Sequence, residues 1–256
     1  MATKQATRQN QAITLKGSTA LVTEFFEYSV NSILYQRGLY PSDDFRMVKK
    51  YGLPMLVTAD DSLKEYLSTI LSQVQQWLLS SAINRLVLAI KSLETNETVE
   101  RWQFDIRKEE EDDGDEKLER KGKGENEKLG KKGKGDKENI PEDNKNQLEK
   151  KKKKVKTEKE IQGEIREIMK QITSSVTFLP ILDEPCTFTL LAYTNDSPDV
   201  AIPSTWGDAD PHLIDRGKVE QVRLRSFSTD VHHLEVRYFT LSFHLNHHSH
   251  LILTTD

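Results

Sequence analysis

The chain has 256 residues, of which 36% are hydrophobic and 30% are charged, and its formal net charge is −4. This length allows one sizeable domain with an insert or a tail, and the sequence contains no apolar run long enough for a helical membrane span. A single cysteine, Cys186, excludes an intramolecular disulfide, and the first residues lack the apolar core of a secretory signal, so we expect a soluble protein in a reducing compartment.

The first helical pattern runs from Leu21 to Leu34, where hydrophobic residues recur at spacings of three and four. Ser18 precedes the pattern as its expected N-cap, and Gly38 follows it as the expected stop. Because the apolar stripe is wide and rich in aromatic residues, the pattern predicts a central, well-buried helix.

A strand, a second helix and a hairpin are expected next. Residues 53–58 form a short apolar run, and Asp60 and Asp61 are placed to cap a helix that continues to about residue 78. Two strand patterns follow, at residues 85–92 and 99–106, and the polar turn between them predicts an antiparallel hairpin.

Residues 107–160 differ from the rest of the chain. They hold 19 basic and 17 acidic side chains and no aromatic residue. Such a segment cannot bury enough apolar surface to offset its chain entropy, so we expect a disordered charged insert. Without it the chain carries a net charge of −6, which argues against general binding of nucleic acid.

A third helix and several strands are expected after the insert. Isoleucines at helical spacing predict a helix from Ile161 to Ile172. Three helices with a mainly antiparallel, hairpin-connected sheet indicate an α+β fold. The strand patterns cover residues 176–179, 187–194, 222–228 and 236–245.

Several long motifs occur in a fixed order along the chain. They are Asn31–Gly38 (NSILYQRG), Glu100–Ile106 (ERWQFDI), Gln171–Pro180 (QITSSVTFLP) and Val222–Phe227 (VRLRSF). Together they closely resemble the HORMA-domain proteins of the spindle assembly checkpoint. The resemblance implies a flexible N-terminus at 1–12, a HORMA domain at 13–106 and 161–256 divided by the insert at 107–160, and a mobile C-terminal safety belt from about 195 to 256.

The resemblance also implies a non-enzymatic adaptor that needs no cofactor or metal. Proteins of this family switch between open and closed topologies, and the closed form traps a partner peptide under the belt as an added strand. The implied partners are a coiled-coil protein that anchors the checkpoint at kinetochores, the activator of the anaphase-promoting complex and other checkpoint-complex subunits. Neither nucleic acid nor a membrane is expected as a partner. Binding the activator would delay anaphase, and the implied locations are nucleus, kinetochore and cytoplasm.

The expected peptide site combines a receptor strand with the belt. Phe188, Leu190 and Ala192 share one face of the strand at 187–194 by their period of two, and Trp206 and Phe227 lie in the belt region. The alternative is that all five are ordinary core residues. For Phe188 and Leu190 taken alone the core interpretation is favoured, whereas for Trp206 and Phe227 the family resemblance favours a role in the peptide site.

The resemblance further implies a surface through which an open and a closed copy pair. This surface would include Lys170, Gln171, Thr177 and Phe178, and its alternative is a solvated helix face. Lys170 stands where we expect arginine in close relatives, and lysine cannot make the planar fork contact of a guanidinium.

Weaker signals lie in the insert and near the end of the chain. Lys150, Lys151, Lys152, Lys153 and Lys154 form a basic run of nuclear-import type, or else a solvated charge block. The histidines between 244 and 250 form an ordinary surface cluster rather than a metal site. After Thr229 the sequence departs from the family pattern, which leaves a paralogue with a non-functional belt as an alternative. A second alternative is that the chain is a HORMA adaptor of DNA repair, translesion synthesis or the meiotic chromosome axis.

Overall fold

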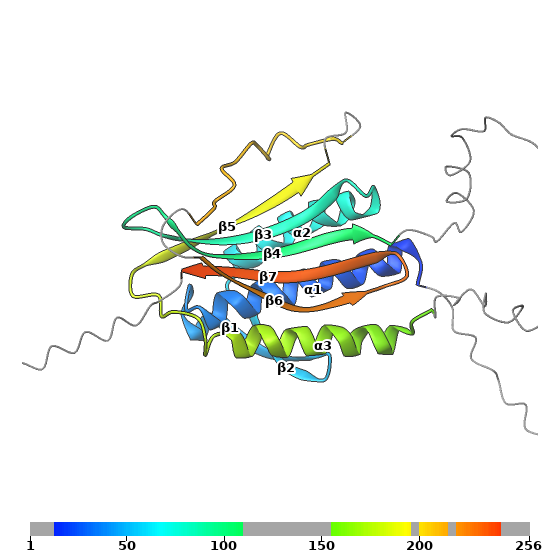
Figure 1. Ribbon diagram of the computed structural model, residues 1–256, viewed down its shortest axis with the longest axis horizontal. Helices are drawn as coiled ribbons and strands as arrows, with labels where there is room; N and C mark the ends of the chain where they lie inside the picture. The colour runs from blue at the N-terminus through cyan, green and yellow to red at the C-terminus, as the bar shows by residue number, and fades with distance from the viewer. Residues whose placement is uncertain (1–12, 110–154, 196–199, 215–218, 242–256) are drawn as a thin grey trace, which may run out of the picture. The chain divides into compact units, whose positions relative to one another are not determined.

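The computed structural model describes residues 13–109, 155–195, 200–214 and 219–241 (Figure 1). Residues Met1–Glu109 and Lys156–Asp256 belong to one compact unit, and the fold below is the fold of that unit. Most of the predicted insert, the first 12 residues and the last 15 lie outside the described residues.

Each of the three described α-helices begins after a polar N-cap residue. They are α1 (Leu15–Gln36), α2 (Asp61–Leu79) and α3 (Glu158–Ser175). Asp60 caps α2 as predicted, and Thr157 with Glu160 forms a capping box on α3. Gly38 has a φ of 64° just beyond α1, which is the left-handed conformation expected of a helix stop. The N-cap of α1 is Thr14, so the assignment of Ser18 to that role was wrong.

The strands form two antiparallel sheets. A five-stranded sheet has the order β5-β3-β4-β7-β6, and β1 pairs with β2 in a separate hairpin. β5 and β6 are therefore the two edges of the larger sheet (Figure 1). The strands are β1 (Phe45–Lys50), β2 (Leu53–Thr58), β3 (Ile83–Ser92), β4 (Thr98–Lys108), β5 (Cys186–Thr194), β6 (Val219–Ser228) and β7 (His232–Leu241).

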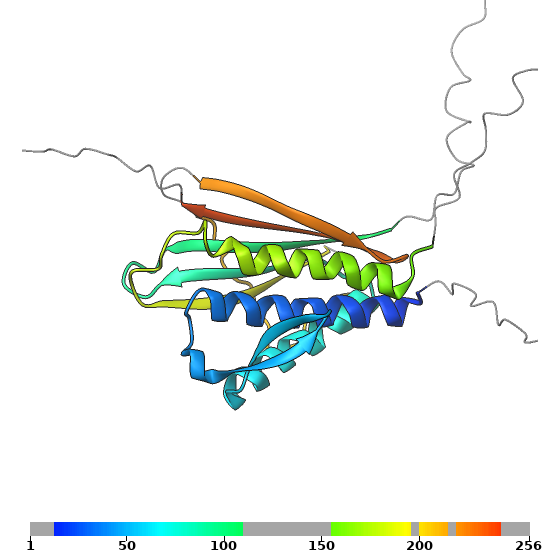
Figure 2. The same cartoon turned by 90° about the horizontal axis from the view of Figure 1, so that it is seen from below.

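All three helices pack on one face of the larger sheet, and α1 lies between that sheet and the β1–β2 hairpin (Figure 2). The centre of the core is aromatic. Phe25 and Phe26 on α1 meet Phe104 on β4 at ring-centroid distances of 6.0 and 5.6 Å. Because these rings are fully buried, α1 is the central helix that its stripe predicted, and the α+β fold is confirmed.

Three sequence expectations need correction, and one strand was missed. Residues 176–179 form turns instead of a strand, because the amides of Thr177 and Phe178 bond back to carbonyls at the end of α3. β1 was not predicted, since its charged residues mask the alternation. The insert boundaries of 107 and 160 were wrong, because β4 continues to Lys108 and α3 begins at Glu158. The last described strand begins at His232 instead of residue 236.

Candidate functional site: a sheet edge crossed by the C-terminal segment

β5 pairs on one side with β3, and among the described strands it has no partner on the other side. The segment 200–214 leads away from β5 and crosses the sheet on its way to β6, which lies at the opposite edge (Figure 1). An edge strand offers backbone N–H and C=O groups to an added strand. The β5 edge is therefore a candidate site for an extended peptide.

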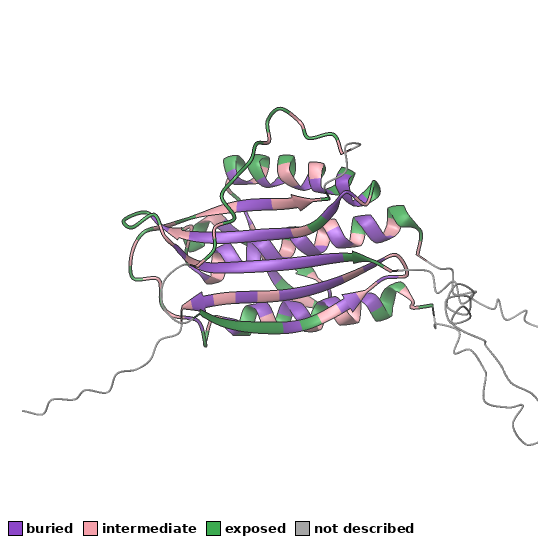
Figure 3. Cartoon of the chain, turned by 45° about the horizontal axis from the view of Figure 1, so that its top comes forward, coloured by how far each residue is buried: buried purple, intermediate pink, exposed green. Residues whose placement is uncertain are grey.

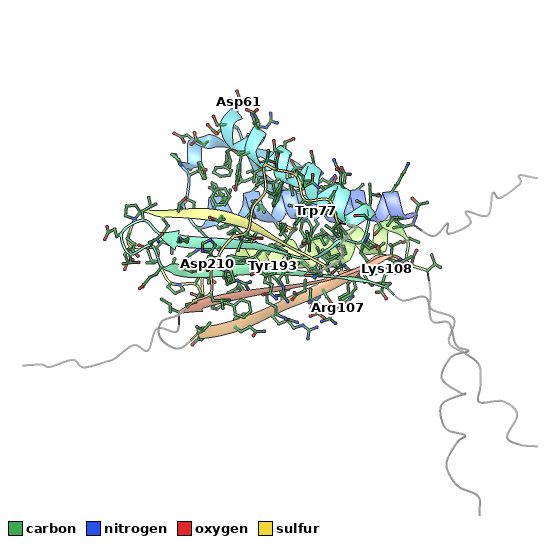
Figure 4. All side chains as sticks on the ribbon, turned by 90° about the horizontal axis from the view of Figure 1, so that it is seen from above. Asp61, Trp77, Arg107, Lys108, Tyr193 and Asp210 are labelled. Carbon is green, nitrogen blue, oxygen red and sulfur yellow. The ribbon has the colours of Figure 1, made fainter. Side chains whose placement is uncertain are left out.

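The segment 200–214 is held against α2 and β5 by aromatic contacts. Trp206 meets Trp77 of α2 edge to face, with ring centroids 4.8 Å apart, and Trp77 Nε1 donates to the Ala201 carbonyl at 3.3 Å. The Tyr193 hydroxyl at the end of β5 lies 3.5 Å from the Pro211 carbonyl. Figure 4 shows Trp77, Tyr193 and Asp210 along this crossing. These contacts place a strap beside the free edge of β5.

Cavities lie between the strap, α2 and β5. One cavity, of about 520 Å³, is lined by Leu190–Thr194 of β5 together with Trp77 and Trp206–Pro211. A second cavity lies between Tyr66 of α2 and Trp206, with Leu190 at its floor. The two cavities share Leu190, Trp206 and Gly207 in their linings, and we refer to the pair as the channel at β5.

The predicted receptor-strand residues lie together on the helix-facing side of β5. Leu190 is buried and lines both cavities, and Ala192 lines the cavity of about 520 Å³. Phe188 packs edge to face against Tyr40 and Tyr66, with centroids 6.2 and 5.8 Å apart. Tyr66 and Trp77 were not predicted as site residues, because their positions on α2 read as ordinary helix and core positions.

The two belt residues named from the sequence lie in different places. Trp206 lies in the strap beside β5. Phe227 is on β6 at the opposite edge, fully buried with its ring 5.0 Å from that of Phe25. In this topology Phe227 belongs to the core and is not brought together with Phe188, Leu190, Ala192 or Trp206.

The β6–β7 hairpin is fastened at its turn to the start of α1. The Ser18 hydroxyl lies 2.6 Å from His232 Nδ1 and 2.6 Å from Thr229 Oγ1, and all three side chains are buried. The Ile13 amide donates to Asp230 at 3.1 Å. Burial lowers the pKa of His232, which favours the neutral ring, and the tautomer that carries its hydrogen on Nε2 can accept from Ser18 at Nδ1. These bonds hold the hairpin beside β4.

Of the α3 surface named from the sequence, Lys170, Thr177 and Phe178 are exposed, whereas Gln171 is half-buried and contacts the hairpin. Gln171 accepts from the Arg225 amide of β6 at 2.8 Å, and Lys170 pairs with Glu167 at 2.8 Å. Thr177 is exposed, and Phe178 shows 81% of its surface to solvent. Gln171 thus links this surface to the position of the hairpin.

Other sequence signals fall outside this site. Lys150–Lys154 and the histidines beyond residue 241 lie outside the described residues. Across the described ranges no group of three or more potential ligands is placed to hold a metal ion. None of the described helices combines the length and apolar character needed to cross a membrane.

Comparison with known proteins identifies close relatives. The family model of the HORMA domain matches residues 18–232. The mitotic spindle assembly checkpoint protein MAD2A of Dictyostelium discoideum is 44% identical over 223 residues, which cover 87% of this chain and 90% of the relative. The MAD2A protein of Homo sapiens is 40% identical over 224 residues, 88% of this chain and 90% of the relative. A chain in a crystal structure of the mitotic checkpoint complex matches with a TM-score of 0.67 and 36% identity, covering 88% of this chain and 99% of that one.

Proposed function

We propose that this chain, which belongs to the HORMA-domain family and within it to the MAD2 spindle checkpoint proteins, traps an extended peptide between β5 and the strap at 200–214. The observation that carries the proposal is the free β5 edge with Trp206 and its neighbours seated beside it. The protein acts in the spindle checkpoint as an adaptor and not as a catalyst.

The arrangement explains both affinity and slow release. A peptide strand beside β5 gains backbone hydrogen bonds, while Leu190, Trp77 and Trp206 offer apolar contacts to its side chains. The strap continues into β6, which is fixed in the sheet through β7 and β4. A peptide under the strap can leave only if the strap or the hairpin opens locally, and such openings make dissociation slow.

The proposed ligands are peptide segments of checkpoint partners. They are the coiled-coil protein that anchors the checkpoint at kinetochores and the activator of the anaphase-promoting complex, and capture of the activator delays anaphase. The names of the relatives and the match to a chain of the mitotic checkpoint complex support checkpoint proteins as the class of partner. The proposed sites of action are the nucleus, kinetochores and cytoplasm, with Lys150–Lys154 as the import signal.

The α3 surface is the proposed contact between two copies of the chain in different topologies. Lys170, Gln171, Thr177 and Phe178 form it, and the exposed Phe178 ring supplies its apolar centre. Because Gln171 bonds to β6, this surface changes when the hairpin leaves β4. The continuous β6–β7 hairpin supports a belt that is competent to close despite the unusual sequence after Thr229.

The test is the release of a labelled partner-derived peptide from the full chain. Trp206→Ala removes one half of the Trp77–Trp206 pair, so dissociation should be about tenfold faster. Met47→Ala, at an exposed position on β1, is the control and should leave the rate unchanged. Equal dissociation rates for the two variants, or unchanged hydrogen exchange of β5 amides on peptide binding, would refute the proposal.

A further inference from the structure

Four arginines gather on the face of the large sheet that points away from the helices. Side chains alternate along a strand, so the neighbours of the core residues Phe104, Ile106 and Val236 point outward. Figure 3 shows this outer face, and Figure 4 labels Arg107 upon it. We call the cluster the arginine face; it comprises Arg85, Arg107, Arg223 and Arg237 around the carboxylates of Asp105 and Glu235.

The cations of the arginine face outnumber its anions. Asp105 is shared by Arg85 at 2.6 Å and Arg237 at 3.2 Å. Glu235 is shared by Arg237 at 2.7 Å, Arg223 at 2.9 Å and, more loosely, Arg107 at 4.0 Å. Both carboxylates are nearly buried, whereas Arg107 and Arg223 are 65% and 59% exposed. A guanidinium carries five N–H donors, and the ion pairs among the described residues leave donors of the two exposed arginines available to an external acceptor.

The strand register places like charges opposite one another. Arg223 faces Arg237 across the β6–β7 pair, and the carboxylates of Asp105 and Glu235 face each other across the β4–β7 pair. Directly opposed like charges destabilise a sheet. Glu109, 3.8 Å from His233, adds one carboxylate at the rim. The chain has a formal net charge of −4, so this local excess of cations runs against the overall charge.

The arginine face is assembled from two parts of the chain. Arg85 and Arg107 come from β3 and β4 of the central hairpin, whereas Arg223 and Arg237 come from the C-terminal hairpin. The four meet because β7 pairs with β4, so the cluster exists only in this topology. We propose that the arginine face is a docking surface for an acidic peptide segment of a partner protein. Its ligand binds the seated hairpin, in which β7 is paired with β4, and not a released hairpin that has left β4.

Carboxylates suit this surface because paired guanidiniums bind them through bidentate, charge-assisted hydrogen bonds. The two exposed arginines lie away from the cavities at β5, since Arg223 is on β6 at the far edge of the sheet, whereas Arg85 lies over the ring of Tyr193, which lines one of those cavities. An acidic partner and a trapped peptide can therefore occupy the chain together.

The test uses the full chain and a fluorescein-labelled peptide containing six glutamates, followed by anisotropy, with a glutamine counterpart as the neutral probe. The double variant Arg107→Gln/Arg223→Gln should weaken binding of the glutamate peptide at least about tenfold. The control Arg46→Gln/Lys49→Gln makes the same change in net charge on the exposed β1 strand and should weaken it less than about twofold. Glu235→Gln removes an internal competitor and should tighten binding about threefold.

Each alternative outcome overturns the proposal. Equal loss in the two double variants would show general charge attraction, including attraction to the lysine run of the insert. Weaker binding of a folded Glu235→Gln variant would show that Glu235 assists the ligand instead of competing with it. A single-stranded oligonucleotide of similar length that bound more tightly than the peptide, and lost affinity in Arg107→Gln/Arg223→Gln, would identify a nucleic-acid surface instead.

Discussion

The contact between Ser18 and the C-terminal hairpin offers the sharpest test of how the topology is held. The Ser18 hydroxyl is fully buried and bridges His232 and Thr229, which lie more than 200 positions away in the sequence. Ser18→Ala removes the bridge without adding bulk. Thr19→Val is a matched control, because the neighbouring Thr19 hydroxyl is also buried but has no hydrogen-bond partner among the described residues.

The size of the effect follows from the groups left behind. Loss of the Ser18 hydroxyl leaves His232 Nδ1 buried without its donor, which costs about 1–3 kcal/mol. That free energy corresponds to a change of roughly 5- to 150-fold in the equilibrium between the seated and the released hairpin. The better helix propensity of alanine acts in both states and largely cancels. Thr19→Val should change the equilibrium by less than about twofold, because no hydrogen bond is lost.

Amide hydrogen exchange measures this equilibrium directly. Amides of β7 that bond to β4 should exchange faster in Ser18→Ala by the same factor, whereas β3 amides should keep their protection. Ion-exchange chromatography should also reveal a larger share of a second folded form. If β7 protection in Ser18→Ala equals that in Thr19→Val, the Ser18 bridge does not hold the hairpin and the reasoning fails.

Three further perturbations test other parts of the fold. Burial holds the pKa of His232 below its ordinary value of about 6.5. The seated hairpin should therefore be most stable above that pH and should loosen as the pH falls below it. His232→Asn should remove this component of the pH dependence of hydrogen exchange in β7. Arg37 and Glu100 form a buried ion pair with 2.8 Å between Nε and Oε2, although these two atoms are not aligned for a hydrogen bond. Glu100→Gln should lower the free energy of unfolding in urea by about 3–5 kcal/mol, because it leaves Arg37 buried without its partner charge. The double variant Arg37→Met/Glu100→Leu should recover most of that loss. Deleting residues 110–154 should leave the melting temperature nearly unchanged. Deleting residues 108–158 should lower the free energy of unfolding by at least about 1 kcal/mol, because the Thr157 cap of α3 is lost. Equal melting temperatures of the two deletion variants would contradict this reasoning.

The sequence determined which residues face the core. Helical spacing located all three α-helices, and alternation located the strand whose residues Leu190 and Ala192 line the channel at β5. The ordered motifs indicated the HORMA family before any geometry was known, and the match over residues 18–232 confirmed it. These properties could be predicted because they depend on patterns within a few residues of one another.

Only the tertiary structure decided which elements meet. The sequence left open whether Phe227 packs against a peptide or the core, and the structure places its ring against Phe25 in the core. Ser18 was given the capping role of Thr14, because a local pattern does not show that its hydroxyl meets His232. The arginine face likewise depends on β7 pairing with β4, a contact between residues more than 100 positions apart. Long-range pairing is set by the packing of the whole core, and a local pattern carries no record of it.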